Sequence, residues 1–170
     1  RFDKPPFYYW LMGIIYAVPG NQNWDQLGSL SARLPSALAS LFLFLMLGDS
    51  ILYHQKRSKY KSYLAIVGSL GFALSPLVII WSRTAVSDSL LCGTIGISLL
   101  LFWKKFVENR NENCRLPWIF LSLAILTKGP VAAVIVMLTL TIFLSTQEDW
   151  RNLLLKIKPL KGILIRFLIS

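Results

Sequence analysis

The sequence predicts an all-α membrane protein whose helices cross the bilayer as a multi-pass bundle. Of its 170 residues, 55% are hydrophobic and only 15% are charged, and the mean hydropathy is +0.56. A soluble protein usually carries about 25% charged residues. The apolar residues also form runs close to the length of about 20 residues that a helix needs to cross a bilayer. Because lipid offers no hydrogen-bond partners and these runs do not alternate in polarity, helices fit them and barrels do not.

The basic net charge of +10 does not indicate a nucleic-acid partner. Basic nucleic-acid-binding domains are usually rich in charge overall, and this chain is poor in it. The abundance of Leu, Ile, Val and Phe excludes intrinsic disorder. Two cysteines without a second pair, Cys92 and Cys114, indicate neither a disulfide framework nor a zinc site.

The apolar runs predict one interfacial helix and three spans before the last run. Residues 7–19 are aromatic and apolar but too short to cross, so we expect a helix lying at the membrane surface. The spans are expected at residues 34–53, 63–82 and 85–104. Pro76 should kink the second of these spans, because proline inside a helix removes a backbone hydrogen bond.

The last apolar run contains Thr127-Lys128-Gly129-Pro130, where Gly and Pro together break a helix. We therefore expect a helix-turn-helix, re-entrant or with short arms, built from residues 116–127 and 130–146. The basic residues after 150 support a hairpin over a single crossing. A hairpin leaves them on the same face as the basic loops 54–62 and 104–115, which the positive-inside rule makes cytoplasmic. The chain is then a multi-pass plasma (inner) membrane protein.

The first candidate site residue is Lys4, which precedes Pro5, Pro6 and an aromatic stretch that includes Tyr8. The prolines fix their own φ and hold Lys4 in an extended conformation. A lysine at headgroup level can bind a lipid phosphate as a compact point charge. The alternative is an interfacial anchor with Lys4 in solvent.

Arg83 and Asp88 form a second candidate group, in the linker that should face outward. A carboxylate there can bind an acceptor or orient a base. The simpler accounts are that Ser87 or Asp88 caps the following helix, and that Arg83 snorkels or pairs with Asp88.

Lys128 is the third candidate, because an ionisable residue inside an apolar run is expensive and therefore a functional hypothesis by default. The alternative is a lysine at the apex of the turn that reaches the interface by snorkelling.

Several motifs in this order resemble the polyprenyl-phosphate-sugar glycosyltransferases of the C superfold (GT-C). They are Lys4-Pro-Pro-Phe-Tyr-Tyr-Trp-Leu11, Ala32-Arg-Leu-Pro-Ser-Ala-Leu38, Ser75-Pro76, Arg83 to Asp88, and Leu126-Thr-Lys-Gly-Pro-Val131. The chain is similar to the aminoarabinose transferases that modify lipid A and to the dolichyl-phosphate-mannose protein mannosyltransferases. The resemblance covers residues 4 to about 145.

The resemblance implies an enzyme that moves a sugar from a polyprenyl-phosphate donor to a lipid or protein acceptor on the outer face. It implies that Lys4 contacts the donor phosphate and stabilises the leaving group, with Lys128, Arg83 and Tyr8 on the donor side. Asp88 matches an acidic position near the acceptor or the catalytic machinery. No cofactor is implied with certainty, and a divalent metal stays open. The other expected partners are membrane lipids, and no nucleic acid is expected.

The family's principal carboxylate lies in an Asp-Glu motif upstream of Lys-Pro-Pro, and nothing precedes Arg1 here. We therefore expect this chain to be part of a longer enzyme and inactive alone. Two other functions stay open on sequence. A transporter or lipid flippase would line its pathway with the same charged residues, and a truncated scaffold would have no activity.

Overall fold

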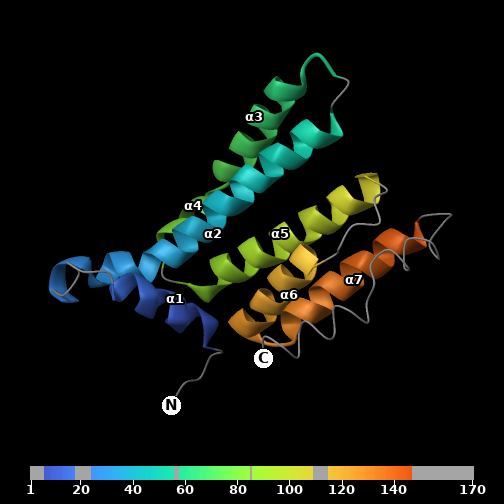
Figure 1. Cartoon of the computed structure of the whole chain (residues 1–170). Coiled ribbons are helices and arrows are strands. Elements are labelled where there is room, and N and C mark those ends of the chain that lie inside the picture. The colour runs from blue at the N-terminus through green and yellow to red at the C-terminus, as the bar shows by residue number, and fades with distance from the viewer. Residues whose placement is uncertain (1–5, 18–23, 56–57, 85, 109–114, 147–170) are drawn as a thin grey trace.

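The computed structural model of this chain describes most of its residues as helices joined by short connections (Figure 1). The described residues are 6–17, 24–55, 58–84, 86–108 and 115–146. Every regular element among them is an α-helix, and two or three of these helical segments could cross a membrane. The predicted all-helical membrane fold class is confirmed for this part of the chain.

The first two helices are very different in length. Helix α1 (Phe7–Tyr16) begins directly after Pro6, in the region predicted to be interfacial. Helix α2 (Trp24–His54) has 31 residues, so it extends for about 46 Å at 1.5 Å per residue. Its part Ala32–His54 is long and apolar enough to cross a membrane.

The second predicted span is a broken helix. Helix α3 (Lys61–Ala73) and helix α4 (Pro76–Arg83) meet at a bend of 61°, and only together do they reach the length of a span. Pro76 is at the start of α4, where its missing N–H removes no hydrogen bond. The expected kink is therefore present, as a break between two helices. Both helices pack against α2 (Figure 1).

Helix α5 (Ser87–Glu108) is the central element of the fold. Its part Ser87–Val107 is long and apolar enough to cross a membrane. It packs against α2 on one side and against α6 and α7 on the other. Figure 1 shows α2 and α5 closest near the start of α5 and diverging toward its end.

Helices α6 (Arg115–Lys128) and α7 (Val131–Ser145) form the hairpin predicted at Thr127–Pro130. Gly129 makes the turn with a φ of +80°, a conformation that glycine adopts at little cost. The arms have 14 and 15 residues, or about 21 to 23 Å at 1.5 Å per residue. Each arm is shorter than a standard span of about 20 residues.

The main apolar core lies between α5, α6 and α7. Phe102 of α5 meets Trp118 of α6 edge to face, with ring centroids 5.6 Å apart, and both rings are buried. A smaller core joins α1, α2 and α5 through Tyr8, Ala39 and Leu90. Many large apolar side chains of α2, α3 and α7 are exposed in this chain alone, as expected for surfaces that face lipid.

Candidate functional site

Two of the predicted site residues, Asp88 and Lys128, form an ion pair. Asp88 lies in the first turn of α5 and Lys128 is the last residue of α6. A negative charge at a helix start and a positive charge at a helix end both interact favourably with the helix dipole. The side chain of Asp88 is 36% exposed and that of Lys128 is 37% exposed. The pair therefore lies at the edge of the helix bundle, where a ligand can reach it.

The carboxylate of Asp88 is unevenly exposed. Its Oδ1 atom is shielded from solvent and is the atom that pairs with the Lys128 ammonium. An interaction between two ionised groups of this kind is stronger than one between neutral polar groups. Because the Lys128 side chain is 37% exposed, a second anion can approach the ammonium from solvent.

The structure pairs Asp88 with Lys128, not with Arg83, as one of the sequence-based accounts expected. Arg83 ends α4 and its side chain is exposed. The alternative that Ser87 caps α5 finds no support. The buried Oγ atom of Ser87 makes no hydrogen bond to the described residues. Lys4 lies outside the described residues, so its predicted phosphate contact stays a prediction.

Tyr8 has a definite place in the fold. It is 7% exposed, and its hydroxyl donates a hydrogen bond of 2.6 Å to the carbonyl oxygen of Ala32 in α2. Its hydroxyl oxygen also lies 3.5 Å from Ser36 Oγ. Tyr8 therefore fastens α1 to α2, and its predicted contact with the donor stays a prediction.

An apolar groove of about 440 Å³ runs beside α5, between α1, α2 and α6. Most of its wall consists of aliphatic and aromatic side chains. The lining residues from α5 are Leu90, Gly93, Thr94, Ile97 and Leu101. They share one helix face, and their span of eleven residues corresponds to about 16 Å at 1.5 Å per residue.

The groove and the ion pair meet the same end of α5 from different sides. Leu90 lines the groove, and at 3.6 residues per turn Asp88 lies about 160° from it around the helix axis. The distance across a helix with its side chains is about 10 to 12 Å. The groove and the ion pair are therefore separated at this end of α5 by about the width of one helix.

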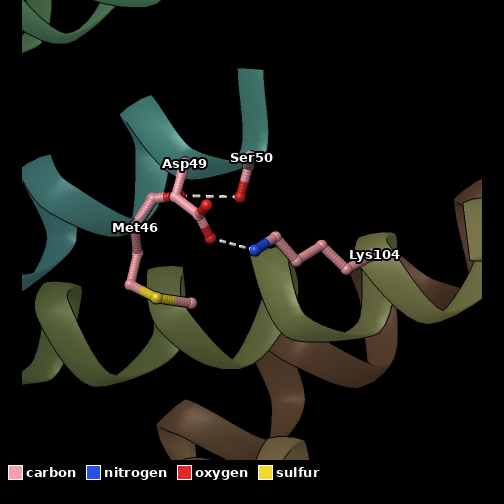
Figure 2. Close-up of polar contacts among 4 residues, drawn as sticks. All are labelled: Met46, Asp49, Ser50 and Lys104. Atoms are coloured by element: carbon pink, nitrogen blue, oxygen red, sulfur yellow. Dashed lines mark hydrogen bonds and ion pairs between the residues drawn. The ribbon is translucent and has the colours of Figure 1, made fainter. Parts of the chain in front are cut away.

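A second ion pair, between Asp49 of α2 and Lys104 of α5, lies toward the opposite end of α5 (Figure 2). The Lys104 ammonium also lies 5.6 Å from the centre of the Tyr53 ring. His54 and Trp103 are in ring contact beside it, with centroids 5.6 Å apart. This end of the helices has the composition of a membrane interface, where aromatic and basic residues gather.

Among the described residues, no three His, Cys, Asp or Glu side chains gather as a metal site. Sequence reasoning also missed two features of the site region. The first is the apolar groove, which arises from how four helices cross. The second is Ser36, a fully buried residue that bonds to the start of α5. Its only signal in the sequence was its place in the Ala32-Arg-Leu-Pro-Ser motif.

Comparison with known proteins identifies the family. Residues 3–170 match the sequence profile of the dolichyl-phosphate-mannose-protein mannosyltransferase family. The chain belongs to this family. The predicted resemblance to the mannosyltransferase type of GT-C protein is thereby confirmed.

Two relatives of this dolichyl-phosphate-mannose-protein mannosyltransferase family member come from Aquifex aeolicus (strain VF5), both described as "Uncharacterized protein". One is 32% identical over 172 residues, which cover 100% of this chain and 35% of the relative. The other is 29% identical over 170 residues, which cover 100% of this chain and 32% of the relative. The chain thus spans about a third of these relatives. No solved structure gives a significant match.

Proposed function

We propose that this chain is part of a membrane glycosyltransferase that moves a sugar from a polyprenyl-phosphate donor to a lipid or protein acceptor on the outer face. The observation that carries the proposal is that the start of α5 has an apolar groove on one side and a charged pair on another, so that one lipid-phosphate ligand could contact both. Membership of the mannosyltransferase family supports the same reaction class.

The groove suits the hydrocarbon part of the donor. A polyprenyl chain is a long, flexible apolar ligand, and it gains about 25 cal/mol for each Å² that it removes from water. The groove offers side chains such as Phe7, Leu11 and Phe42, and it follows the long axis of α5. Phe7 lies three positions after Lys4 in the sequence. The phosphate of such a ligand is the partner that we predict for Lys4, whose position lies outside the described residues.

The charged groups suit the head of the donor and the acceptor. In the transfer step an acceptor hydroxyl oxygen bonds to the anomeric carbon of the sugar, and the bond from that carbon to the phosphate oxygen breaks. The polyprenyl phosphate leaves with the electron pair, and a carboxylate takes the acceptor proton. Positive charge from Lys4 and Lys128 stabilises the departing phosphate. In this proposal Asp88 lies beside the acceptor hydroxyl in the same step.

The Asp88–Lys128 pair then has a role before the donor arrives. Each residue neutralises the other while the site is empty. A donor phosphate offers Lys128 a stronger anionic partner, and the exchange leaves the Asp88 carboxylate available for the acceptor. Arg83, exposed at the end of α4, adds positive charge to the same outer side.

The alternative of a transporter or flippase gains less from the structure. Such proteins use broken helices around a charged site in the membrane. The break between α3 and α4 falls at Leu74 and Ser75, neither of which is charged. Of this break and the turn between α6 and α7, only the turn has a charged residue beside it, Lys128.

The test is to incubate membranes that contain the protein with labelled polyprenyl-phosphate sugars. We expect one donor to be consumed and its label to appear on an acceptor. Lys128→Met should lower this transfer by at least about 100-fold, as loss of a key charge in an active site does. Lys104→Met is the matched control, since it removes the lysine of the other ion pair that involves α5, and it should keep most of the activity.

Two outcomes would count against the proposal. Movement of the labelled lipid across the membrane without loss of its sugar would indicate a flippase. Equal activity in Lys128→Met and Lys104→Met would remove Lys128 from the site.

A further inference from the structure

Ser36 of α2 holds the start of α5 through two hydrogen bonds. Ser36 is 0% exposed, and its hydroxyl donates to the carbonyl oxygen of Val86 at 3.1 Å. The carbonyl oxygen of Ser36 accepts a hydrogen bond of 3.0 Å from the hydroxyl of Ser89. Val86 and Ser89 are on the two sides of Asp88 in the chain. One residue of α2 therefore fixes the backbone around Asp88 from both directions.

Several buried hydroxyls bond within their own helix, whereas those of Ser36, Ser89 and Ser98 bond to a residue outside it. Ser50 donates to the carbonyl of Met46, and Ser122 donates to that of Trp118. Both bonds stay within one helix and span four residues, as hydroxyls in helices usually do. The hydroxyl of Ser36 instead leaves its own helix and reaches a residue fifty positions away. Local helix geometry does not explain it.

The same turn of α2 also carries the contact with α1. Tyr8 gives its hydroxyl proton to Ala32, one turn before Ser36. Each hydroxyl has a single proton, and Ser36 gives its own to Val86. The separation of 3.5 Å between the two hydroxyl oxygens is therefore a close contact and not a second strong bond. Residues 32–36 of α2 therefore make hydrogen bonds both to α1 and to the start of α5.

We propose that Ser36 is a positioning residue that sets the place of Asp88 relative to α1 and α2. Its effect on catalysis rests on the proposed transferase function, because Asp88 must meet an acceptor near a donor bound beside α1. The effect on the position of α5 does not depend on that function. Removing the hydroxyl leaves the part-buried Val86 carbonyl without this partner, so the start of α5 gains freedom to shift.

The experiment compares Ser36→Ala with Ser98→Ala in membranes that contain the protein. Ser98 is the matched control, since it is also 0% exposed and donates to a carbonyl on another helix, that of Pro117, at 2.9 Å. We expect Ser36→Ala to lower kcat for sugar transfer by about 10- to 100-fold, the range for misplacement of a catalytic group. KM for the donor should change by less than about threefold, and Ser98→Ala should retain kcat within about threefold.

A second measurement reports the position of α5 relative to α2 directly and does not require sugar transfer. Spin labels at Cys92, which is exposed one turn after Asp88, and at Leu41→Cys, exposed on α2, report the distance between the two helices. Cys114→Ser removes the other thiol. Ser36→Ala should broaden or shift the distance distribution, and Ser98→Ala should not. Ser89→Ala, which removes the second bond and leaves Ser36 intact, should act in the same direction if Ser36→Ala does not fold.

The outcomes separate the two proposals. Unchanged distances in both Ser36→Ala and Ser89→Ala, or equal broadening in Ser98→Ala, would overturn the positioning role. Altered distances with unchanged kcat would overturn the proposed effect of Ser36 on transfer and leave only its effect on the position of α5. Wild-type protein that transfers no sugar would refute the proposed function, while the distances still decide whether Ser36 positions α5.

Discussion

Gly93 of α5 lies against Ala39 of α2 with no room for a side chain. A Cβ atom at position 93 would lie 2.9 Å from the Ala39 Cβ atom and 3.1 Å from the Ala39 carbonyl oxygen. Real Cβ atoms almost never come within 3.0 Å of another heavy atom, and the approach to the Ala39 carbonyl oxygen is tighter than nine in ten real Cβ contacts. This contact brings α2 and α5 together one turn after Ser89, so it shapes both the apolar groove and the start of α5.

Gly93→Ala should therefore destabilise the protein, although alanine favours helices. The added methyl group must push backbone aside, and overpacking of this kind costs about 1 to 3 kcal/mol. Gly71→Ala is the control, since a Cβ atom there meets nothing within 4 Å, and it should be neutral or stabilising by up to about 1 kcal/mol. Thermal unfolding in detergent measures both. A Gly93→Ala variant as stable as Gly71→Ala would contradict the close crossing.

The Asp88–Lys128 pair should matter more for activity than for stability. Both side chains are more than one-third exposed, and ion pairs at such positions contribute about 0 to 1 kcal/mol. Asp88→Asn should thus shift the unfolding temperature by only a few degrees and reduce sugar transfer strongly. The measurements are thermal unfolding and transfer on the same membrane preparation. A large loss of stability with a parallel loss of transfer would indicate a structural pair.

Asp49→Asn is the matched control for that experiment, at the other ion pair of α5 (Figure 2). The Asp49 side chain is 60% exposed, so solvent screening keeps its contribution below about 1 kcal/mol. Lys104 retains its contact with the Tyr53 ring when the carboxylate is lost. We expect small effects on both stability and transfer. A loss of transfer equal to that of Asp88→Asn would assign both ends of α5 to the reaction.

Much of the fold was predictable because each helix is bounded by a clear chemical change. Charged residues end the apolar runs, and Gly129-Pro130 interrupts the last run where the structure turns with a φ of +80°. The break at Ser75 was expected from Pro76, but its angle of 61° was not. That angle depends on how α3 and α4 both pack along α2, which a single sequence does not display.

The sequence predicted which residues belong to the candidate site, but it did not predict which of them form the ion pair. Lys128 stood out as a charge inside an apolar run, and Asp88 as a carboxylate before one. Their contact joins the start of α5 to the end of α6, two points far apart in the sequence. Ser36 gave no chemical signal of its own, because a buried serine usually bonds within its helix.

Gly129→Ala tests the link between the hairpin turn and Lys128. A φ of +80° is unfavourable for alanine, so the change should destabilise the hairpin by about 1 kcal/mol. Gly129→Asn should be milder, since asparagine adopts positive φ more readily. The adjacent Lys128 should lose its alignment with Asp88, and transfer should fall in the same order, with Ala below Asn. Equal transfer in wild type and both variants would show that the turn does not position Lys128.

The orientation in the membrane can be tested by reporter fusions after Lys61 and after Ser145. Lys61 begins α3 and Ser145 ends α7, and the positive-inside rule puts the basic loop before α3 in the cytoplasm. With α6 and α7 as a hairpin, both fusions should report the cytoplasmic side. A third fusion after Thr84, between α4 and α5, should report the opposite side, where Asp88 and Lys128 are proposed to act. If the fusions after Lys61 and Ser145 report opposite sides, the hairpin crosses as one span and the outward placement of Lys128 fails with it.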